Sequence, residues 1–136
     1  MDPQLRPLET PNQPWSVGPY STALRAGDWI VISGQIGVDS ATGKLVDGGG
    51  EAQARQALAN LVAVITDCGC SWEQVAKVTQ FVAVDPSEMQ AINAAYAEVV
   101  GECRPARSTV GVAWLPLGAL YEIEAWLYRP LNKPQA

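Results

Sequence analysis

Two stretches of the chain repeat their hydrophobic residues every three or four positions, which is the pattern of an amphipathic helix with one buried face. The first stretch covers residues 51–68, with Glu51 in its first turn and Gly69 at its exit. Its hydrophobic positions are Ala54, Leu58, Leu61, Ile65 and Cys68. The second stretch contains Met89, Ile92, Tyr96 and Val99. Ser87 with Gln90 predicts a capping box at its start, and Gly101 predicts its end.

Runs rich in β-branched and aromatic residues predict strands around these helices. A hairpin is expected to join residues 23–25 to residues 29–32 through the turn Ala26-Gly27-Asp28. Further strands are expected at residues 78–84, 108–114 and 120–128. Ser71 with Gln74 predicts a short capped helical turn before the first of these. Residues 38–50 contain several glycines but lack the lysine of a phosphate-binding loop, so we expect an ordinary loop there.

The resulting order, ββαβαββ, predicts a single α+β domain with a mixed sheet and two helices on one of its faces. Alternation along the last strand should place Tyr121, Ile123, Ala125 and Leu127 against the helices, and Glu122, Glu124, Trp126 and Tyr128 on the other face. In the strand before it, Val110 and Val112 are taken as the packing residues. That choice leaves Arg107, Thr109 and Gly111 on the face away from the helices, together with Glu122.

The composition supports one compact domain, because 136 residues with 48% hydrophobic and 17% charged positions are ordinary for a globular protein. Residues 1–16 hold four prolines and no apolar run typical of a secretory signal, so they are expected to form an extended arm. The domain would then cover residues 17–130, followed by a tail at 131–136. No run of residues is long and apolar enough to predict a membrane-spanning helix.

Charge and cysteine content narrow the possible partners. The chain has 14 acidic and 9 basic residues, a net charge of −5, which argues against binding a nucleic acid through its phosphates. Cys68-x-Cys70 resembles half of a metal site, but the chain has no histidine to complete one, so no metal and no other cofactor is expected. The odd number of cysteines fits reduced thiols and a cytoplasmic location.

One pair of charged residues carries most of the candidate chemistry. Arg107, within Pro105-Ala106-Arg107-Ser108-Thr109, offers a planar fork that binds a carboxylate or phosphate through two hydrogen bonds. Glu122 could accept a proton or hold a water molecule. The simpler interpretation is that both are exposed strand residues without a function. An aromatic and charged sheet face of this kind is, however, typical of an interface, so clefts between subunits would hold the pair.

Seven segments, in this order and spacing, resemble the RidA (YjgF) family of enamine/imine deaminases. They are Gly18-Pro19-Tyr20-Ser21, Val31-Ile32-Ser33-Gly34-Gln35-Ile36, Gln53-Ala54-Arg55-Gln56-Ala57-Leu58, Val78-Thr79 before Phe81, Asn93-Ala94-Ala95-Tyr96, Pro105-Ala106-Arg107-Ser108-Thr109-Val110 and Tyr121-Glu122-Ile123-Glu124-Ala125. The resemblance implies a chorismate-mutase-like fold, a homotrimer with three sites between subunits, and hydrolysis of 2-imino acids and their enamines to 2-oxo acids and ammonia.

The resemblance also implies roles for individual residues. Arg107 matches the arginine that clamps the substrate carboxylate, and Glu122 matches the glutamate that positions or activates water. The remaining matches to pocket residues are Tyr20, Ser33, Asn93 and the backbone of Gly34 and Thr109. Gly111 departs from the pattern, since many members carry glutamate there, and the segment 101–104 is shorter than in several members; both changes bear on the substrate range.

Two other functions remain open at this stage. A trimer that binds 2-oxo acids or similar carboxylates without catalysis would use the same arginine. An endoribonuclease is the other, against which the acidic charge and missing histidine argue. A serine nucleophile is not expected, because there is no histidine to act as its base.

Overall fold

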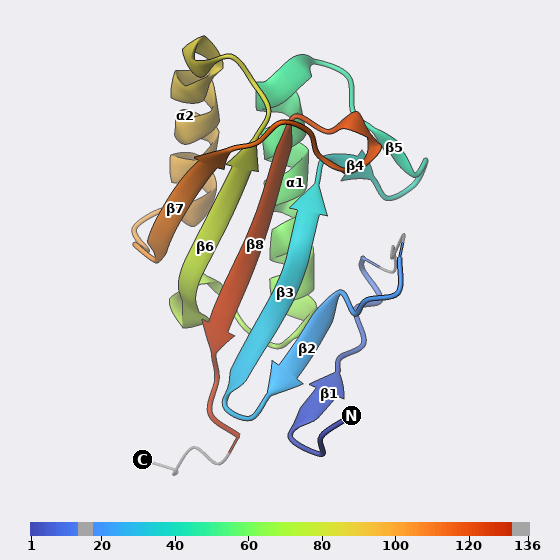
Figure 1. Cartoon of the computed structure of the whole chain (residues 1–136). Helices are drawn as coiled ribbons and strands as arrows, with labels where there is room; N and C mark the ends of the chain where they lie inside the picture. Colours follow the sequence, from blue (N-terminus) through green and yellow to red (C-terminus); the bar gives the residue numbers. More distant parts are fainter. Residues whose placement is uncertain (14–17, 132–136) are drawn as a thin grey trace.

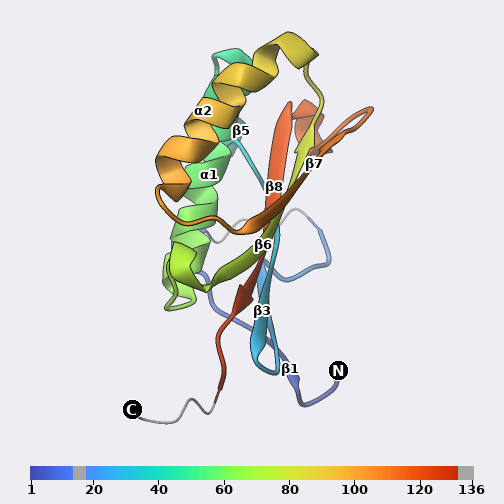
Figure 2. The same cartoon turned by 90° about the vertical axis from the view of Figure 1, so that its left-hand side faces the viewer.

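The computed structural model describes residues 1–13 and 18–131, which form a six-stranded sheet with two helices packed on one face (Figures 1 and 2). The helices are α1 (Gly49–Asp67) and α2 (Met89–Val100). The strands of the sheet are β1 (Leu5–Pro7), β2 (Ala23–Ala26), β3 (Trp29–Ile36), β6 (Val75–Val82), β7 (Ala106–Gly111) and β8 (Tyr121–Tyr128). The end of the expected arm and most of the expected tail lie outside the described residues.

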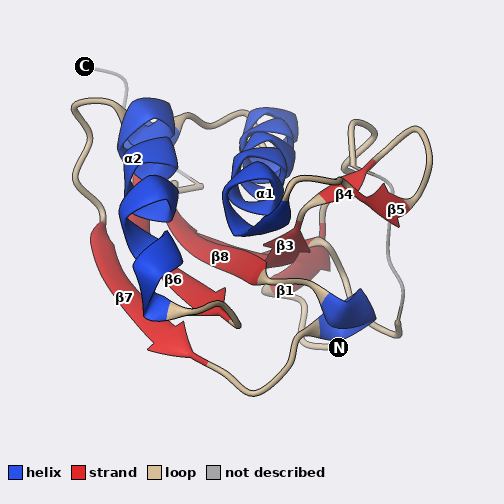
Figure 3. Cartoon of the chain, turned by 90° about the horizontal axis from the view of Figure 1, so that it is seen from above, coloured by secondary structure: helices blue, strands red, loops and turns tan. Residues whose placement is uncertain are grey.

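The order of strands across the sheet is β1-β2-β3-β8-β6-β7, so the last strand of the chain lies in its centre. Every neighbouring pair is antiparallel except β6 and β7, which are parallel and connected through α2. The mixed sheet and the two helices on one face are therefore as predicted (Figure 3). Three strands were not expected. Strand β1 joins the N-terminal segment to the sheet, and β4 (Val38–Asp39) pairs with β5 (Lys44–Leu45) within the expected loop.

Both helices form where the hydrophobic repeat predicts them, and their ends differ in how they are capped. Helix α1 follows Gly48, whose φ of 113° is readily adopted only by glycine. Before α2, Asp85 and not Ser87 supplies the cap, because its carboxylate accepts a hydrogen bond of 2.9 Å from the backbone N–H of Ser87. The short 3₁₀ turn Pro86–Glu88 intervenes, so the predicted Ser87–Gln90 capping box is wrong. The box formed by Ser71 and Gln74 is confirmed.

The hydrophobic core lies between the helices and one face of the sheet, and the alternation in β8 is as predicted. All four residues that were expected to pack inward are fully or almost fully buried: Tyr121, Ile123, Ala125 and Leu127. The opposite face of the sheet, called the open face below, carries Glu122, Glu124, Trp126 and Tyr128. On the buried face, a large aliphatic side chain such as Ile123 or Leu127 stabilises the fold by about 1.5–3 kcal/mol.

The prediction for β7 was wrong, and the parallel pairing of β6 with β7 shows why. Partners in a sheet project from the same face, and Arg107 pairs with Val78, Thr109 with Gln80, and Gly111 with Val82. All three β6 partners are buried under the helices. Arg107, Thr109 and Gly111 therefore lie on the helix side of the sheet, whereas Val110, exposed over 43% of its surface, lies on the open face.

The error has a physical cause. Strand β7 is an edge strand that is exposed along its whole length, so its valines do not mark a buried side. Since Glu122 pairs with Phe81 on the open face, Arg107 and Glu122 lie on opposite faces of the sheet within one chain. A site that uses both side chains cannot be closed by one chain in this conformation.

A buried asparagine fastens the N-terminal segment to the rest of the domain. Asn60 of α1 is 4% exposed, and its Nδ2 donates to the carbonyl oxygens of Ile36 and Val38, each at 2.9 Å. Its Oδ1 accepts from Gln13 Nε2 and from Gln56 Nε2, both at 2.8 Å. One side chain thus links the end of β3, the N-terminal segment and the helix.

Replacing this asparagine should be costly. Asn60→Ala leaves two backbone carbonyls and the Gln13 amide without their partner, and each buried group left unpaired costs about 1–3 kcal/mol. We expect the free energy of unfolding to fall by roughly 2–4 kcal/mol in urea titrations. The control is Gln56→Ala, which removes a single bond of the same cluster. Equal losses in both variants would contradict the central role of Asn60.

Candidate functional site

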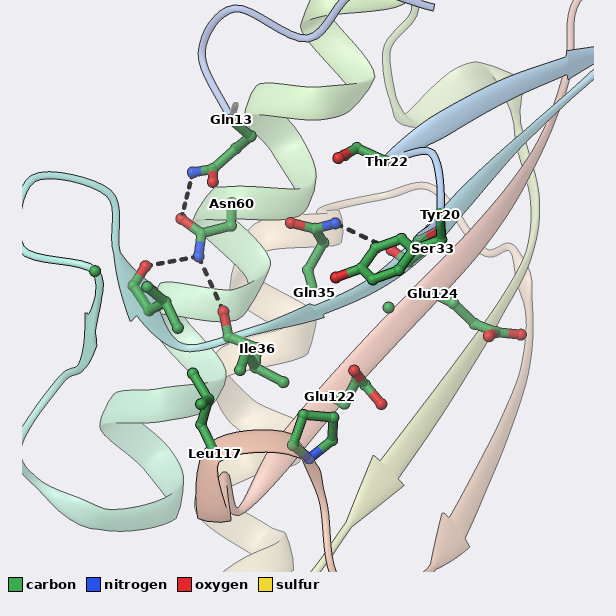
Figure 4. Close-up of a pocket in the computed structure, with 14 residues that line it drawn as sticks. Gln13, Tyr20, Thr22, Ser33, Gln35, Ile36, Asn60, Leu117, Glu122 and Glu124 are labelled. Atoms are coloured by element: carbon green, nitrogen blue, oxygen red, sulfur yellow. Dashed lines mark hydrogen bonds between the residues drawn. The ribbon is translucent and has the colours of Figure 1, made fainter. Parts of the chain in front are cut away.

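Four of the residues implied by the family resemblance surround one cavity, which lies beside β3 and next to the start of β2. The cavity measures ≈ 380 Å³ and is lined by Tyr20, Ser33, Gly34 and Glu122, here called the glutamate pocket (Figure 4). Its wall also contains Gln13, Gln35, Asn60, Leu117 and Glu124. The pocket forms because a bulge between Ile32 and Gln35 shifts the pairing of β3 with β8 and turns Ser33 and Gly34 toward the space.

Glu122 lies directly against the backbone of Gly34. A β-carbon added at Gly34 would be 2.6 Å from the Cδ and Oε2 atoms of Glu122, so any larger residue would displace the carboxylate. Burial raises the pKa of Glu122, and the nearby negative charge of Glu124 raises it further. A carboxyl group with a raised pKa exchanges protons near neutral pH more readily than an ordinary glutamate, which suits an acid–base role.

Ser33 holds the segment that carries Tyr20. Its hydroxyl donates a hydrogen bond of 2.6 Å to the carbonyl oxygen of Ser21. Its backbone N–H donates one of 2.9 Å to the carbonyl oxygen of Thr22. The Ser33 proton is therefore engaged with the backbone, which fits a structural part and not that of a nucleophile. The Tyr20 ring, 47% exposed, points into the same hollow as the Glu122 carboxylate (Figure 4).

The resemblance did not include the residues that close the other sides of this pocket. Leu117 has a φ of 59°, which is strained for a branched side chain, and lies at the mouth with 59% of its surface exposed. No sequence pattern marks such a position. Asn60 could have been suspected, since it is a polar residue on the helix face that otherwise buries Ala57, Leu61 and Val64.

The second group of expected residues forms a separate site on the helix side of β7, here called the arginine site. The Arg107 guanidinium lies 4.8 Å from the centre of the Tyr96 ring, a cation–π contact that holds the fork against α2. Thr109 follows two positions later on the same face. Asn93 is exposed and precedes Tyr96 by three residues, so it projects from the same side of α2.

The arginine site is open to an anion. Among the described residues no carboxylate pairs with Arg107, and the only ion pairs join Arg55 to Glu51 and Glu98. A β-carbon added at Gly111 would meet no atom within 4 Å, so the space beside this residue is open. The structure thus brings the expected residues together as two separate groups, one around Glu122 and one around Arg107.

Other kinds of site receive no support from the described part of the chain. There, no three His, Cys, Asp or Glu side chains are grouped so that they could hold a metal ion. Neither described helix is long and apolar enough to cross a membrane. An arginine fork can bind a small carboxylate, and a half-buried glutamate can hold a water molecule.

Comparison with known proteins identifies the family to which this fold and sequence belong. A family model described as Endoribonuclease L-PSP matches residues 10–128. A solved structure of RidA from an Antarctic Psychrobacter is 36% identical with a TM-score of 0.84, covering 90% of this chain and 98% of that one. The chain belongs to the RidA family.

Individual RidA-family relatives bear different names. The goat protein named 2-iminobutanoate/2-iminopropanoate deaminase is 40% identical over 120 residues, 88% of this chain and 87% of that protein. A RutC family protein from Pyrococcus horikoshii is 42% identical over 120 residues, 88% of this chain and 94% of its own. The structure of Escherichia coli TdcF with bound serine is 34% identical with a TM-score of 0.84, covering 91% of this chain and 98% of that one.

The charge of Glu124 gives a test of the glutamate pocket. Glu124→Gln removes a negative charge beside Glu122 and should lower the pKa of Glu122, which burial will still hold above its ordinary value. Carbon-13 NMR titration of the Glu122 carboxyl group measures this directly. Glu73→Gln, an exposed change on a different element, is the control. A Glu122 pKa that does not move in Glu124→Gln would show that the two carboxylates do not interact.

The same raised pKa predicts a dependence of stability on pH. As the pH rises through the ordinary carboxyl range, the unfolded chain loses its Glu122 proton before the folded protein does. The folded state then binds more protons, so its stability falls until the pH passes the raised pKa. Glu122→Gln should remove this part of the decline in urea titrations at a series of pH values.

Proposed function

We propose that this protein hydrolyses reactive 2-imino acids and their enamine tautomers, such as 2-iminopropanoate and 2-iminobutanoate, to 2-oxo acids and ammonia. The observation that carries the proposal is the combination of an arginine fork that pairs with no carboxylate among the described residues and a half-buried glutamate whose pKa is raised. The deaminase names of relatives at about 40% identity, such as the goat protein, support the same substrate class.

The two sites must meet across an interface between copies of the chain, because Arg107 and Glu122 lie on opposite sheet faces. A homotrimer would meet this requirement three times by the same contact. The open face has the surface for such an assembly. Trp29, Trp126 and Tyr128 are 38%, 45% and 48% exposed and form edge-to-face contacts with centroids 6.3 and 5.1 Å apart. Large exposed aromatic clusters mark interfaces.

The chemistry needs only positioning and one proton carrier. Arg107 would bind the substrate carboxylate and so fix the neighbouring imine carbon. Glu122 would accept a proton from water as the oxygen bonds to that carbon, and then pass the proton to the nitrogen. The carbon–nitrogen bond then breaks with its electron pair going to nitrogen, the glutamate passes the hydroxyl proton to that nitrogen, and the products are a 2-oxo acid and ammonia.

The two alternatives differ in what they require. A carboxylate-binding trimer needs Arg107 but not the acid–base glutamate. Ribonuclease activity, which the family model's description mentions, would require an acidic chain of net charge −5 to bind a polyanion, and the chain has no histidine for general acid–base catalysis. Imine hydrolysis uses both candidate residues, and for that reason we favour it.

Ammonia release separates catalysis from binding. With 2-iminopropanoate generated in the assay by an amino-acid oxidase, the unmutated protein should release ammonia faster than the uncatalysed reaction. Glu122→Gln should lower kcat roughly 100- to 10,000-fold, as expected for loss of a general acid–base group, while still binding pyruvate. Arg107→Lys keeps the charge but loses the fork, so kcat/KM should fall about 10- to 100-fold, mainly through KM.

Unchanged hydrolysis in both variants would reject the assignment of these residues. Pyruvate binding without any imine hydrolysis would favour the binding protein. RNA cleavage that disappears in Arg107→Ala would favour the ribonuclease instead.

A mixing experiment tests whether the site lies between subunits. Arg107→Lys and Glu122→Gln proteins are each unfolded in urea, combined in equal amounts and refolded together. If each site takes its arginine from one subunit and its glutamate from the neighbour, about one site in four should contain both intact residues. We therefore expect activity to return to about a quarter of that of the unmutated protein, with each variant refolded alone as the control.

The mass of the assembly completes this test. Native mass spectrometry should show trimers that contain both variants. Mixed trimers without recovered activity would show that the two residues do not act across an interface. A monomer would remove the shared site altogether.

A further inference from the structure

A chain of hydrogen bonds runs through the core to the arginine site, and the proposed function does not use it. The Tyr121 hydroxyl of β8 donates to Gln80 Oε1 of β6 at 2.5 Å. Gln80 Nε2 in turn donates to Thr109 Oγ1 of β7 at 3.0 Å. Tyr121 and Gln80 are both 0% exposed. The hydrogen bonds therefore link three neighbouring strands, from the buried centre of the sheet to its exposed edge.

Buried polar side chains of this kind call for an explanation. A fully buried glutamine loses its hydration, which costs free energy even when it is paired, and an aliphatic residue of similar size would serve packing as well. Burial also raises the pKa of Tyr121, so its hydroxyl keeps its proton and remains a donor. Both ends of the Gln80 amide are satisfied, which fixes its orientation.

The direction of these bonds determines where the Thr109 proton points. The Tyr121 hydroxyl donates its one proton to the Gln80 oxygen, so the amide must direct its N–H toward Thr109. The Thr109 oxygen accepts that bond, and its own proton cannot point back toward Gln80. The hydroxyl is therefore left as a donor toward the exposed side of β7.

This donor is close to the arginine fork. Arg107 and Thr109 are two residues apart on one face of the strand, which separates their α-carbons by about 6.6 Å. The contact with the Tyr96 ring keeps the guanidinium beside the strand. A carboxylate has two oxygens, so it can accept from a guanidinium and from a hydroxyl at this spacing.

We propose that Tyr121 and Gln80 are positioning residues that hold the Thr109 hydroxyl as a hydrogen-bond donor to the carboxylate of the substrate bound by Arg107. The inference rests on the proposed function for the nature of the substrate. It gives Thr109 a side-chain role, beyond the backbone role that the family resemblance implies. It also explains why a polar network crosses the core at this level of the sheet.

The test measures binding of pyruvate by calorimetry to the full chain. Thr109→Val keeps the shape but loses the hydroxyl, so Kd should rise roughly tenfold, the loss of a hydrogen bond to a charged group. Thr109→Ser should retain binding within about twofold. Tyr121→Phe frees the Gln80 amide to turn its oxygen toward Thr109, which reverses the hydroxyl, so Kd should rise roughly three- to tenfold.

The double variant distinguishes positioning from a structural role. If Tyr121 acts through the Thr109 hydroxyl, Tyr121→Phe should not weaken binding further once Thr109 is valine. Gln80→Met removes the amide and with it any oxygen that could reverse the Thr109 hydroxyl, so it should weaken binding less than Tyr121→Phe does. The control is Ile123→Val, a fully buried change on the same face of β8 that lies outside the network. It should lower the melting temperature without changing Kd.

Each outcome decides the matter. Equal weakening by Tyr121→Phe in both backgrounds, or a lowered melting temperature with unchanged Kd, would make the network structural only and overturn the inference. If Arg107→Lys weakens pyruvate binding and Thr109→Val does not, the inference about Thr109 is overturned. The proposed function is then unaffected. If Tyr121→Phe and Thr109→Val are coupled in their effect on the Kd for pyruvate but the protein hydrolyses no imine, the inference is supported and the proposed function is rejected. Pyruvate that does not bind the unmutated protein would overturn the inference, whereas the ammonia assay decides the proposed function separately.

Discussion

The position of β8 between β3 and β6 is the constraint on which the rest of the structure depends. Because it is paired on both sides, its register is determined by two neighbours, and its alternating residues have no freedom to exchange faces. Tyr121, Ile123, Ala125 and Leu127 must enter the core, so Glu122 and Glu124 must lie on the open face. A shift of one residue would bury two carboxylates and expose the centre of the core.

Because β8 pairs with β6 and β6 pairs with β7, the same constraint places Arg107 and Glu122 on different faces of the sheet. Since β6 is buried on its helix side at Val78, Gln80 and Val82, the parallel partner β7 must present Arg107 and Thr109 on that side too. The glutamate pocket and the arginine site therefore become surfaces of one chain that face different directions. Under the proposed function, the arginine and the glutamate would act together only where two copies of the chain meet.

Polar residues within the core connect the fold to both sites. Asn60 ties the N-terminal segment and the end of β3 to α1 beside the glutamate pocket, and the Tyr121–Gln80–Thr109 network reaches the arginine site from the centre of the sheet. Each replaces apolar packing with paired hydrogen bonds, which are directional where apolar contacts are not. Such groups help to give each site one defined arrangement of donors.

The sequence by itself determined the helices, most strands and the two-sided character of β8, because these follow from local periodicity, glycine and proline positions and hydrophobic alternation. It also singled out Arg107 and Glu122 by their charge and spacing, and Gly34 through its resemblance to a family pattern. What only the tertiary structure decided was the face of β7, the cap at Asp85, the Leu117 backbone and the partners of Gln80 and Asn60. An exposed edge strand has no buried side to reveal its orientation, so its face depends on the register with β6. Hydrogen bonds between residues far apart in the chain leave no periodic signal, because they exist only once the strands and helices are packed together.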